Sequence, residues 1–329
     1  MFSKRRFLRQ TAAALAGLGM MVAATVPSQA AEDVTYLLPA PAFLPAFGPW
    51  MLANARGYYA EEGLNVTFQS AKGGVDVAKQ VGAGNATVGG AIGDTPLIVR
   101  ANGIPVKAVA VLGGGSLMVL TAHADRGIEG PADLAGKTVT TMSYQDTTFY
   151  ALLGMLANEG LTRNDLDVQA AGPAGTWKLF MAGEADAMAA VPDWIGIALG
   201  AGKELKLFPA DAYFKSMAQA ILASDETIEQ NPELIRKLVR ATLRGLRDIM
   251  TDPSGAAKDY IAAVPQHKDK EAYIETVFGL YNKYVYPGQA VLGAMDRDRL
   301  AGLQKFYVDQ GIVRKETPLD DLYTNEFVQ

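Results

Sequence analysis

The chain has 329 residues, a formal net charge of −5 at pH 7 and no cysteine. An acidic chain argues against nucleic acid as a partner, and the lack of cysteine excludes disulfides, thiol nucleophiles and thiolate zinc sites. With only two histidines in addition, we expect neither a metal nor a cofactor, and a stability that comes from a packed core.

The first 30 residues have the pattern of an export signal. Four basic residues between positions 4 and 9 precede an apolar run at 11–26, and Ser28-Gln29-Ala30 is a small-x-small cleavage site. The run is short and rich in Ala and Gly, which favours cleavage over a retained anchor. Residues 3–9 (SKRRFLR) resemble a twin-arginine signal with Lys in the first pair position, so the twin-arginine and general secretory routes both remain open. We predict a signal peptide at 1–30 and a mature chain of 299 residues with charge −9.

After residue 30, strands and helices alternate. The residues from 73 to 105 are the clearest part, where a glycine pair opens a helix, a small apolar strand follows, and the turn Gly93-Asp94-Thr95-Pro96 leads directly into another helix. Alternation of this kind predicts a mostly parallel sheet with helices on both faces. The expected strands are 34–38, 64–69, 86–92 and 106–112, with a helix at 50–63 between the first two.

A second series begins after the glycine run at 113–115. Strands are expected at 117–121, 138–141, 168–171, 185–190 and 205–208, and helices at 143–159, 175–182 and 192–199. The strand expected at 217–223 returns to the first part, and the remainder is helical. We therefore predict one lobe from 31–119 with 211–329, another from 120–210, and hinge crossings near 115–121 and 208–216.

Several short motifs occur in a recognisable order along almost the whole mature chain. They are 55–66 (ARGYYAEEGLNV), 93–96 (GDTP), 102–106 (NGIPV), 134–139 (LAGKTV), 183–187 (GEADA) and Trp194. With these motifs the chain resembles the periplasmic solute-binding proteins of ABC importers. The group it resembles is the nitrate, sulfonate and taurine type, related to binding proteins for the thiamine pyrimidine precursor.

The resemblance implies an α/β fold of two lobes, the type II periplasmic binding protein fold, with two hinge crossings and closure around a small solute. It also implies a monomer in the periplasm that passes the solute to an ABC permease and its ATPase, without catalysis. Two alternatives remain open: an enzyme of thiamine pyrimidine synthesis on the same fold, and a solute sensor without a transporter. Relatives that make the pyrimidine rely on a cysteine-rich motif, which this chain lacks.

Small solutes bind at the carboxyl ends of parallel strands, where helix N-termini point. Asp94 follows such a strand, and we expect it to cap the next helix. Capping is compatible with ligand contact, because the helix end still offers its remaining N–H groups and the Thr95 hydroxyl. The polar cluster at 143–148 is either a capping network or part of the site, and we favour ligand contact. Lys72 and Lys178 are the only basic residues close to these loops, which disfavours a simple inorganic anion and fits better a zwitterion or a heterocycle with N–H donors. The predicted ligand contacts are Phe43, Phe47, Gly74, Gly93, Asp94, Thr95, Ser143, Tyr144, Gln145, Asp146, Thr147, Trp177, Asp193 and Trp194.

Overall fold

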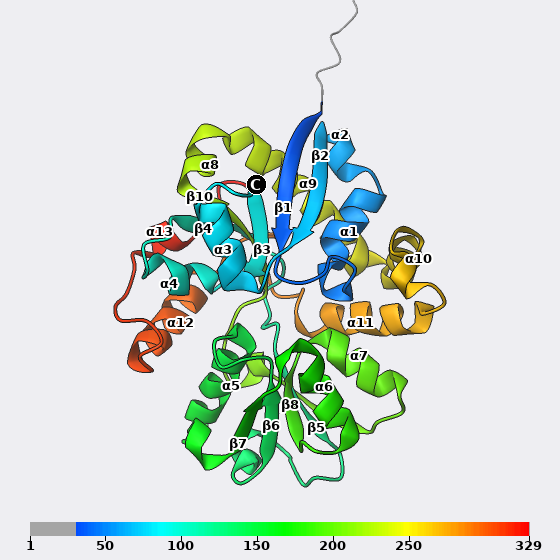
Figure 1. Cartoon of the computed structure of the whole chain (residues 1–329), viewed down its shortest axis with the longest axis vertical. Helices are drawn as coiled ribbons and strands as arrows, with labels where there is room; N and C mark the ends of the chain where they lie inside the picture. Colours follow the sequence, from blue (N-terminus) through cyan, green and yellow to red (C-terminus); the bar gives the residue numbers. More distant parts are fainter. Residues whose placement is uncertain (1–30, 329) are drawn as a thin grey trace, which may run out of the picture. The chain divides into compact units, whose positions relative to one another are not determined.

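The computed structural model describes residues 31–328, which contain two five-stranded sheets (Figure 1). The predicted signal peptide at 1–30 lies outside the described residues. The first sheet has the strand order β2-β1-β3-β10-β4, and the second has the order β7-β6-β8-β5-β9. The strands are β1 (Glu32–Leu38), β2 (Leu64–Ser70), β3 (Val88–Ile92), β4 (Val106–Val111), β5 (Val119–His123), β6 (Thr138–Thr141), β7 (Asp167–Ala170), β8 (Ala187–Ala190), β9 (Leu205–Pro209) and β10 (Gln219–Ser224).

In the first sheet, β1 to β4 run in the same direction and β10 is inserted antiparallel between β3 and β4. All six residues of β10 are buried, as expected for a central strand covered on both faces. The predicted return of the chain to the first sheet is therefore confirmed.

The second sheet has the same plan, with β5 antiparallel between β8 and β9. Side chains of a strand alternate between the two faces of a sheet. Ala187 and Ala189 of β8 accordingly join one core cluster, and Met188 and Ala190 join another on the opposite face. Both sheets are mostly parallel with helices on both faces, which confirms the predicted fold class. The reversed direction of β5 was not predicted.

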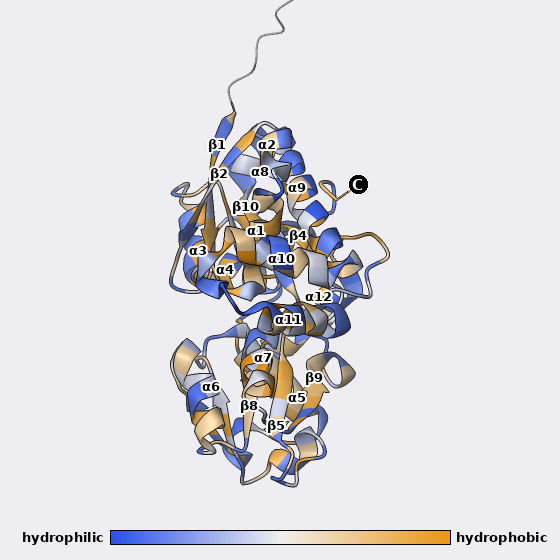
Figure 2. Cartoon of the chain, turned by 90° about the vertical axis from the view of Figure 1, so that its right-hand side faces the viewer, coloured by the Kyte–Doolittle hydropathy of each residue, from blue (hydrophilic) through white to orange (hydrophobic). Residues whose placement is uncertain are grey.

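The helices cover both sheets, and their polar faces turn outward while the strands are largely apolar (Figure 2). We call the first sheet with α1–α4 and α8–α13 the first lobe, and the second sheet with α5–α7 the second lobe. None of the helices in residues 31–328 combines the length and the apolar character needed to cross a membrane. The helices are α1 (Gly48–Ala55), α2 (Tyr58–Glu61), α3 (Gly74–Gly82), α4 (Thr95–Arg100), α5 (Thr147–Asn158), α6 (Gly172–Ala182), α7 (Pro192–Gly200), α8 (Asp225–Gln230), α9 (Pro232–Thr251), α10 (Pro253–Ala263), α11 (Glu271–Tyr284), α12 (Arg297–Asp309) and α13 (Leu319–Leu322).

Two predicted helices differ from the observed ones. The helix expected at 50–63 is broken into α1 and α2, because Gly57 has a φ of 74°, in the left-handed region that a continuous helix does not allow. The helix expected from residue 143 begins at Thr147, because Asp146 has extended backbone and caps the first turn. The residues before Asp146 therefore form a loop at the end of β6.

The chain passes between the sheets in two segments, 112–118 and 210–218, which confirms the two crossings. One buried side chain, Arg299 of α12, binds both segments. Its guanidinium donates to the carbonyl oxygen of Gly114 at 2.7 Å, to that of Ser216 at 2.6 Å through Nε, and to the carboxylate of Asp211. The exact lobe limits remain a prediction, but Arg299 marks where the two segments lie together.

Candidate functional site

Three predicted contacts are acids that follow parallel strands at their carboxyl ends. Asp94 comes after β3 of the first sheet, whereas Asp146 and Asp193 come after β6 and β8 of the second. The carboxyl ends of parallel strands are where α/β folds bind their ligands. The surroundings of these three carboxyl groups therefore define the candidate site.

Asp94 is fully buried and does not cap its helix. Its Oδ2 instead accepts a hydrogen bond from the hydroxyl of Tyr307, a buried residue of α12. Its Oδ1 is buried and has no hydrogen-bond partner in the part of the chain that the structure describes. Burial raises the pKa of Asp94 from 3.8 to about 7, and the nearby charge of Asp146 adds to the increase. The expected side-chain cap at Asp94 is therefore wrong, and its role as a ligand contact stays a prediction.

The second lobe faces Asp94 through α5. The ring of Tyr150 packs edge-on against that of Tyr307, with 5.4 Å between the ring centroids. Burial also raises the pKa values of Asp146, Tyr150 and Tyr307. Within the described residues, the ionisable groups that shift these pKa values are carboxyls and phenols, with no cation among them. We call these four residues, Asp94, Asp146, Tyr150 and Tyr307, the interlobe cluster.

Asp193 makes a second contact between the lobes. Its Oδ1 accepts from the backbone N–H of Ala46 at 3.0 Å, and its Oδ2 accepts from the hydroxyl of Tyr281 in α11 at 2.9 Å. Burial raises its pKa to about 6. Both oxygens are thus occupied by groups of the first lobe, and the carboxylate links α7 to α11, which lie side by side in Figures 1 and 2. Its role as a ligand contact stays a prediction.

The loop before α5 is partly a capping network. The Asp146 carboxylate accepts from the backbone N–H of Thr148 at 2.9 Å and also from its hydroxyl. Ser143 Oγ accepts from the backbone N–H of Gln145 at 3.2 Å, and the Gln145 residue is exposed. The half-buried side chain of Thr147 forms no hydrogen bond within residues 31–328. The two interpretations of this loop are therefore compatible, because capping leaves Thr147 and Gln145 available.

Tyr144 of the same loop turns toward the outer strand of the second sheet. Its hydroxyl donates to the carbonyl oxygen of Val168 at 2.8 Å, and the guanidinium of Arg163 lies 4.5 Å from its ring centroid. The residue is nevertheless 41% exposed. Its hydroxyl is already in use, so a ligand would meet its ring.

The predicted aromatic contacts are spread over both lobes. Phe47 is buried and packs against Trp50 with 6.0 Å between the ring centroids, as a core residue does, whereas Phe43 is 38% exposed. Trp177 and Trp194 are half-buried against the core cluster on the α6 and α7 face of the second sheet. Contact of these rings with a ligand stays a prediction.

The predicted backbone contacts lie together at the carboxyl end of β3. A Cβ added to Gly74 would lie 3.1 Å from the Cβ of Ala91 and 3.5 Å from Thr95 Oγ1, so the start of α3 lies close to the turn before α4. The N–H of Gly93 is used by the carbonyl oxygen of Ala218 at 2.9 Å. Close approach of helix and strand thus explains Gly74 without a ligand.

Sequence reasoning missed three residues of this region. Tyr150 and Tyr307 fall in segments expected only to be helical, although both bring phenol groups to Asp94. Thr141, at the carboxyl end of β6, has a buried hydroxyl without a partner. Thr141 could have been found from its strand-end position. Tyr307 could not, because it is 213 residues from Asp94 in the chain.

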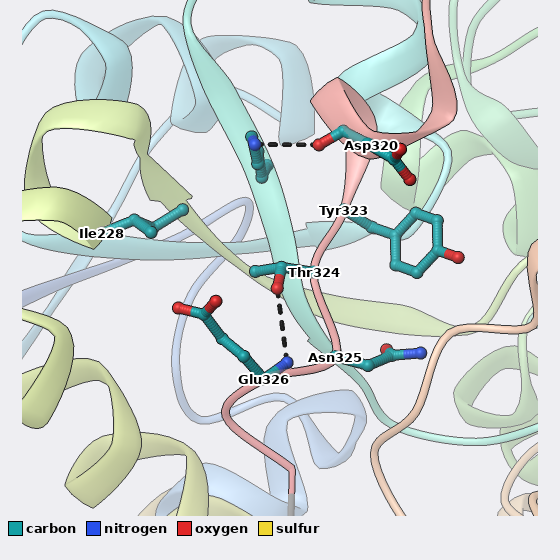
Figure 3. A pocket seen from close by; sticks show the side chains of 7 residues that line it. Ile228, Asp320, Tyr323, Thr324, Asn325 and Glu326 are labelled. Atoms are coloured by element: carbon teal, nitrogen blue, oxygen red, sulfur yellow. Dashed lines mark hydrogen bonds between the residues drawn. The ribbon is translucent and has the colours of Figure 1, made fainter.

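Two surface hollows lie elsewhere. One of about 380 Å³ is bordered by β4, α8 and the C-terminal segment (Figure 3). There Lys107 Nζ donates to the carbonyl oxygen of Asp320, and Thr324 Oγ1 accepts from the N–H of Glu326, so these polar groups bind each other. The other, of about 290 Å³, lies beside Gly114 and Arg299 at the crossings. Within residues 31–328 no group of three or more acidic, His or Cys side chains is placed to hold a metal ion.

Known proteins share both the fold and the sequence pattern. The alkanesulfonate-binding protein SsuA of Xanthomonas axonopodis pv. citri, solved with bound MOPS, superimposes with a TM-score of 0.71 at 17% identity, covering 90% of this chain and 99% of that one. The riboflavin-binding protein RibY of Chloroflexus aurantiacus is 30% identical over 301 residues, covering 86% of this chain and 82% of RibY. The 4-amino-5-hydroxymethyl-2-methylpyrimidine phosphate synthase THI13 of Saccharomyces cerevisiae is 24% identical over 274 residues, covering 74% of this chain and 74% of THI13.

Two sheets joined by two crossings, with strand ends facing each other, define the periplasmic binding protein fold, as the likeness to SsuA shows. The model of the family described as "NMT1/THI5 like" matches residues 44–256. The chain belongs to this family, and the resemblance seen in its motifs is confirmed.

Proposed function

We propose that the protein is the solute-binding component of an ABC importer. It captures a small organic solute between its lobes in the periplasm, as a monomer, and delivers it unaltered to a permease and its ATPase. The observation that carries this proposal is the interlobe cluster, where Tyr150 of one lobe meets Tyr307 of the other beside an unpartnered oxygen of Asp94. Opening of the lobes about the crossings would expose this oxygen to a solute.

The proposed contacts come from both lobes. Gly74, Gly93, Asp94 and Thr95 supply the first-lobe side, and the loop at 143–147 supplies the second-lobe side. Phe43, Phe47, Trp177, Asp193 and Trp194 complete the proposed set. The signal at 1–30 would be cleaved on export.

Sulfonates, taurine, nitrate and pyrimidines are the ligand classes suggested by the sequence. RibY adds riboflavin, because it is named as a riboflavin-binding protein and shares 30% identity with this chain. A flavin is a planar heterocycle with an N–H donor, and so falls in a class that the scarcity of cations already favoured.

The experiment is a thermal-shift screen of the mature protein against these ligands, followed by calorimetry. A ligand at 100 times its Kd stabilises a protein by about 2.7 kcal/mol, which is visible in the melting temperature. We expect one class to bind and to be recovered unchanged. Absence of binding by every class would refute the proposal.

An enzyme of thiamine pyrimidine synthesis is the second candidate, favoured by the likeness to THI13. The chain has no cysteine, which speaks against it. Mass spectrometry would separate the two, because a synthase forms new pyrimidine phosphate from other compounds, whereas a binding protein only returns the pyrimidine that was supplied. A sensor without a transporter would bind the same solute but would not support its uptake by cells.

A further inference from the structure

We propose that Asp94 Oδ1 determines specificity by accepting a hydrogen bond from an N–H group of the solute, and that the interlobe cluster rejects plain anions. The inference rests on the proposed function and names the chemistry of its ligand. It concerns the oxygen that has no hydrogen-bond partner among residues 31–328, although it is fully buried.

Tyr307 decides which oxygen is available. Its hydroxyl donates to Asp94 Oδ2, so that oxygen is an acceptor in either protonation state of the acid. A buried polar atom without a partner is costly, and most such atoms in proteins are paired. An N–H donor that reaches Oδ1 would remove this cost when the lobes close on the solute.

The charges around Asp94 favour such a donor over an anion. Tyr307 approaches from α12, while Asp146 and Tyr150 approach from α5. Two of these four groups are carboxyls, and none is basic. A sulfonate or nitrate placed here would meet negative charge in a water-poor site, where repulsion is strong. An uncharged imide or amine, or an ammonium group, would not.

The number of protons released or taken up on binding shows whether an N–H donor or an anion lies next to Asp94. With the lobes placed as in this structure, burial raises the pKa of Asp94 to about 7, so an unliganded site of this geometry holds a proton there in part of the molecules at pH 6.5. A bound N–H donor favours the carboxylate form and expels this proton. A bound anion favours the protonated form and takes a proton up.

The experiment is calorimetry of the mature protein at pH 6.5 in two buffers with different ionisation enthalpies, which gives the protons exchanged per ligand. The four probes are riboflavin, 4-amino-5-hydroxymethyl-2-methylpyrimidine, taurine and ethanesulfonate. Taurine and ethanesulfonate share the sulfonate, but only taurine has an N–H donor. Riboflavin and taurine distinguish an uncharged donor from an ammonium group. We expect an N–H probe to bind tightest and to release up to one proton.

Substitution of Asp94 by Asn gives a sharper test. In Asp94→Asn a Tyr307 hydroxyl that keeps donating, as it does to the carboxylate, holds the amide oxygen at the Oδ2 position and places the NH₂ group at the Oδ1 position. The side-chain NH₂ group then faces the N–H group of the solute, and two donors cannot form a hydrogen bond. We expect binding of the N–H probe to weaken about ten-fold or more, with no proton released. In Asp94→Asn combined with Tyr307→Phe the amide can turn over, so part of the affinity should return.

The matched control is Asp309→Asn, which removes an exposed carboxyl of the same helix as Tyr307. It should bind as the wild type does. Should Asp94→Asn fail to fold, the proton count of the wild type decides alone. Tightest binding of ethanesulfonate, or N–H probe binding without proton release, would overturn the inference and leave solute binding intact. Failure of all four probes to bind would overturn the inference, and failure of nitrate as well would refute the proposed function.

Discussion

Replacement of Arg299 by Leu tests whether one side chain holds the two crossing segments together. Arg299 has 8% of its side chain exposed, and its guanidinium donates to Gly114, Ser116, Asp211 and Ser216. Leucine fills much of the space and removes all of these donors. The carbonyl oxygens of Gly114 and Ser216 and the Asp211 carboxylate then lose this donor, although Ser116 Oγ still donates to Asp211 at 2.6 Å.

The expected loss follows from the burial of the pair. Removing one partner of a buried ion pair costs about 3–5 kcal/mol. The Asp211 side chain is 31% exposed, so water recovers part of its hydration, and we take the lower end of that range, about 3 kcal/mol. For a chain of this length each kcal/mol lowers the melting temperature by about 2 °C, which gives a shift of about 6 °C. Arg299→Lys keeps the positive charge but not the planar guanidinium, so its melting temperature should lie between those of Arg299→Leu and the wild type.

Differential scanning calorimetry of the mature protein measures the shift. The control is Arg297→Leu on the same helix, where the arginine side chain is 54% exposed and pairs with Asp320, itself 83% exposed. Exposed pairs contribute little, so this variant should melt within about 1 °C of the wild type. If Arg299→Leu melted at the same temperature as Arg297→Leu, the crossing segments would not depend on Arg299.

Three further changes have defined outcomes. Burial raises the pKa of Asp193 from 3.8 to about 6, so the folded state binds a proton at this carboxyl more readily than the unfolded chain does. The resulting stabilisation of the fold is present below about pH 4 and is lost as the pH rises through 6. The urea midpoint should therefore fall less between pH 4.5 and 7.5 in Asp193→Asn than in the wild type; equal falls would contradict this pKa. Thr147→Val should weaken solute binding by about 1 kcal/mol in calorimetry, and unchanged affinity would remove Thr147 from the site. Gly245→Ala should lower the melting temperature, because the new Cβ would lie 2.2 Å from the carbonyl oxygen of Pro49. Gly302→Ala, with open space around it, should instead stabilise the protein by up to about 1 kcal/mol. If both variants were stabilised, α1 would have to move away from α9 to make room for the new Cβ.

The strands were predictable because their apolar runs are bounded by glycine and proline. The second series after the glycine run follows from this pattern, whereas the return strand β10 was predictable only from its apolar run between Ser216 and Ser224. The continuous helix expected at 50–63 was wrong because Gly57, a weak helix former between helix-forming residues, adopts a left-handed backbone angle and interrupts it. The direction of β5 was not predictable, since a strand has the same side-chain pattern in parallel and antiparallel pairs.

The sequence by itself determined the fold class, the two crossings and the polar residues at the strand ends, because these depend on local patterns and on motifs that lie in order along the chain. Only the tertiary structure decided how those residues are used. Asp94 lost its interpretation as a cap when Tyr307, 213 residues away, proved to bind one of its oxygens. Asp193 proved to link α7 to α11 through groups far from it in sequence. Burial and hydrogen-bond partners depend on which distant segments pack together, and that packing separates a carboxyl group that holds the protein together from one that is free to bind a solute.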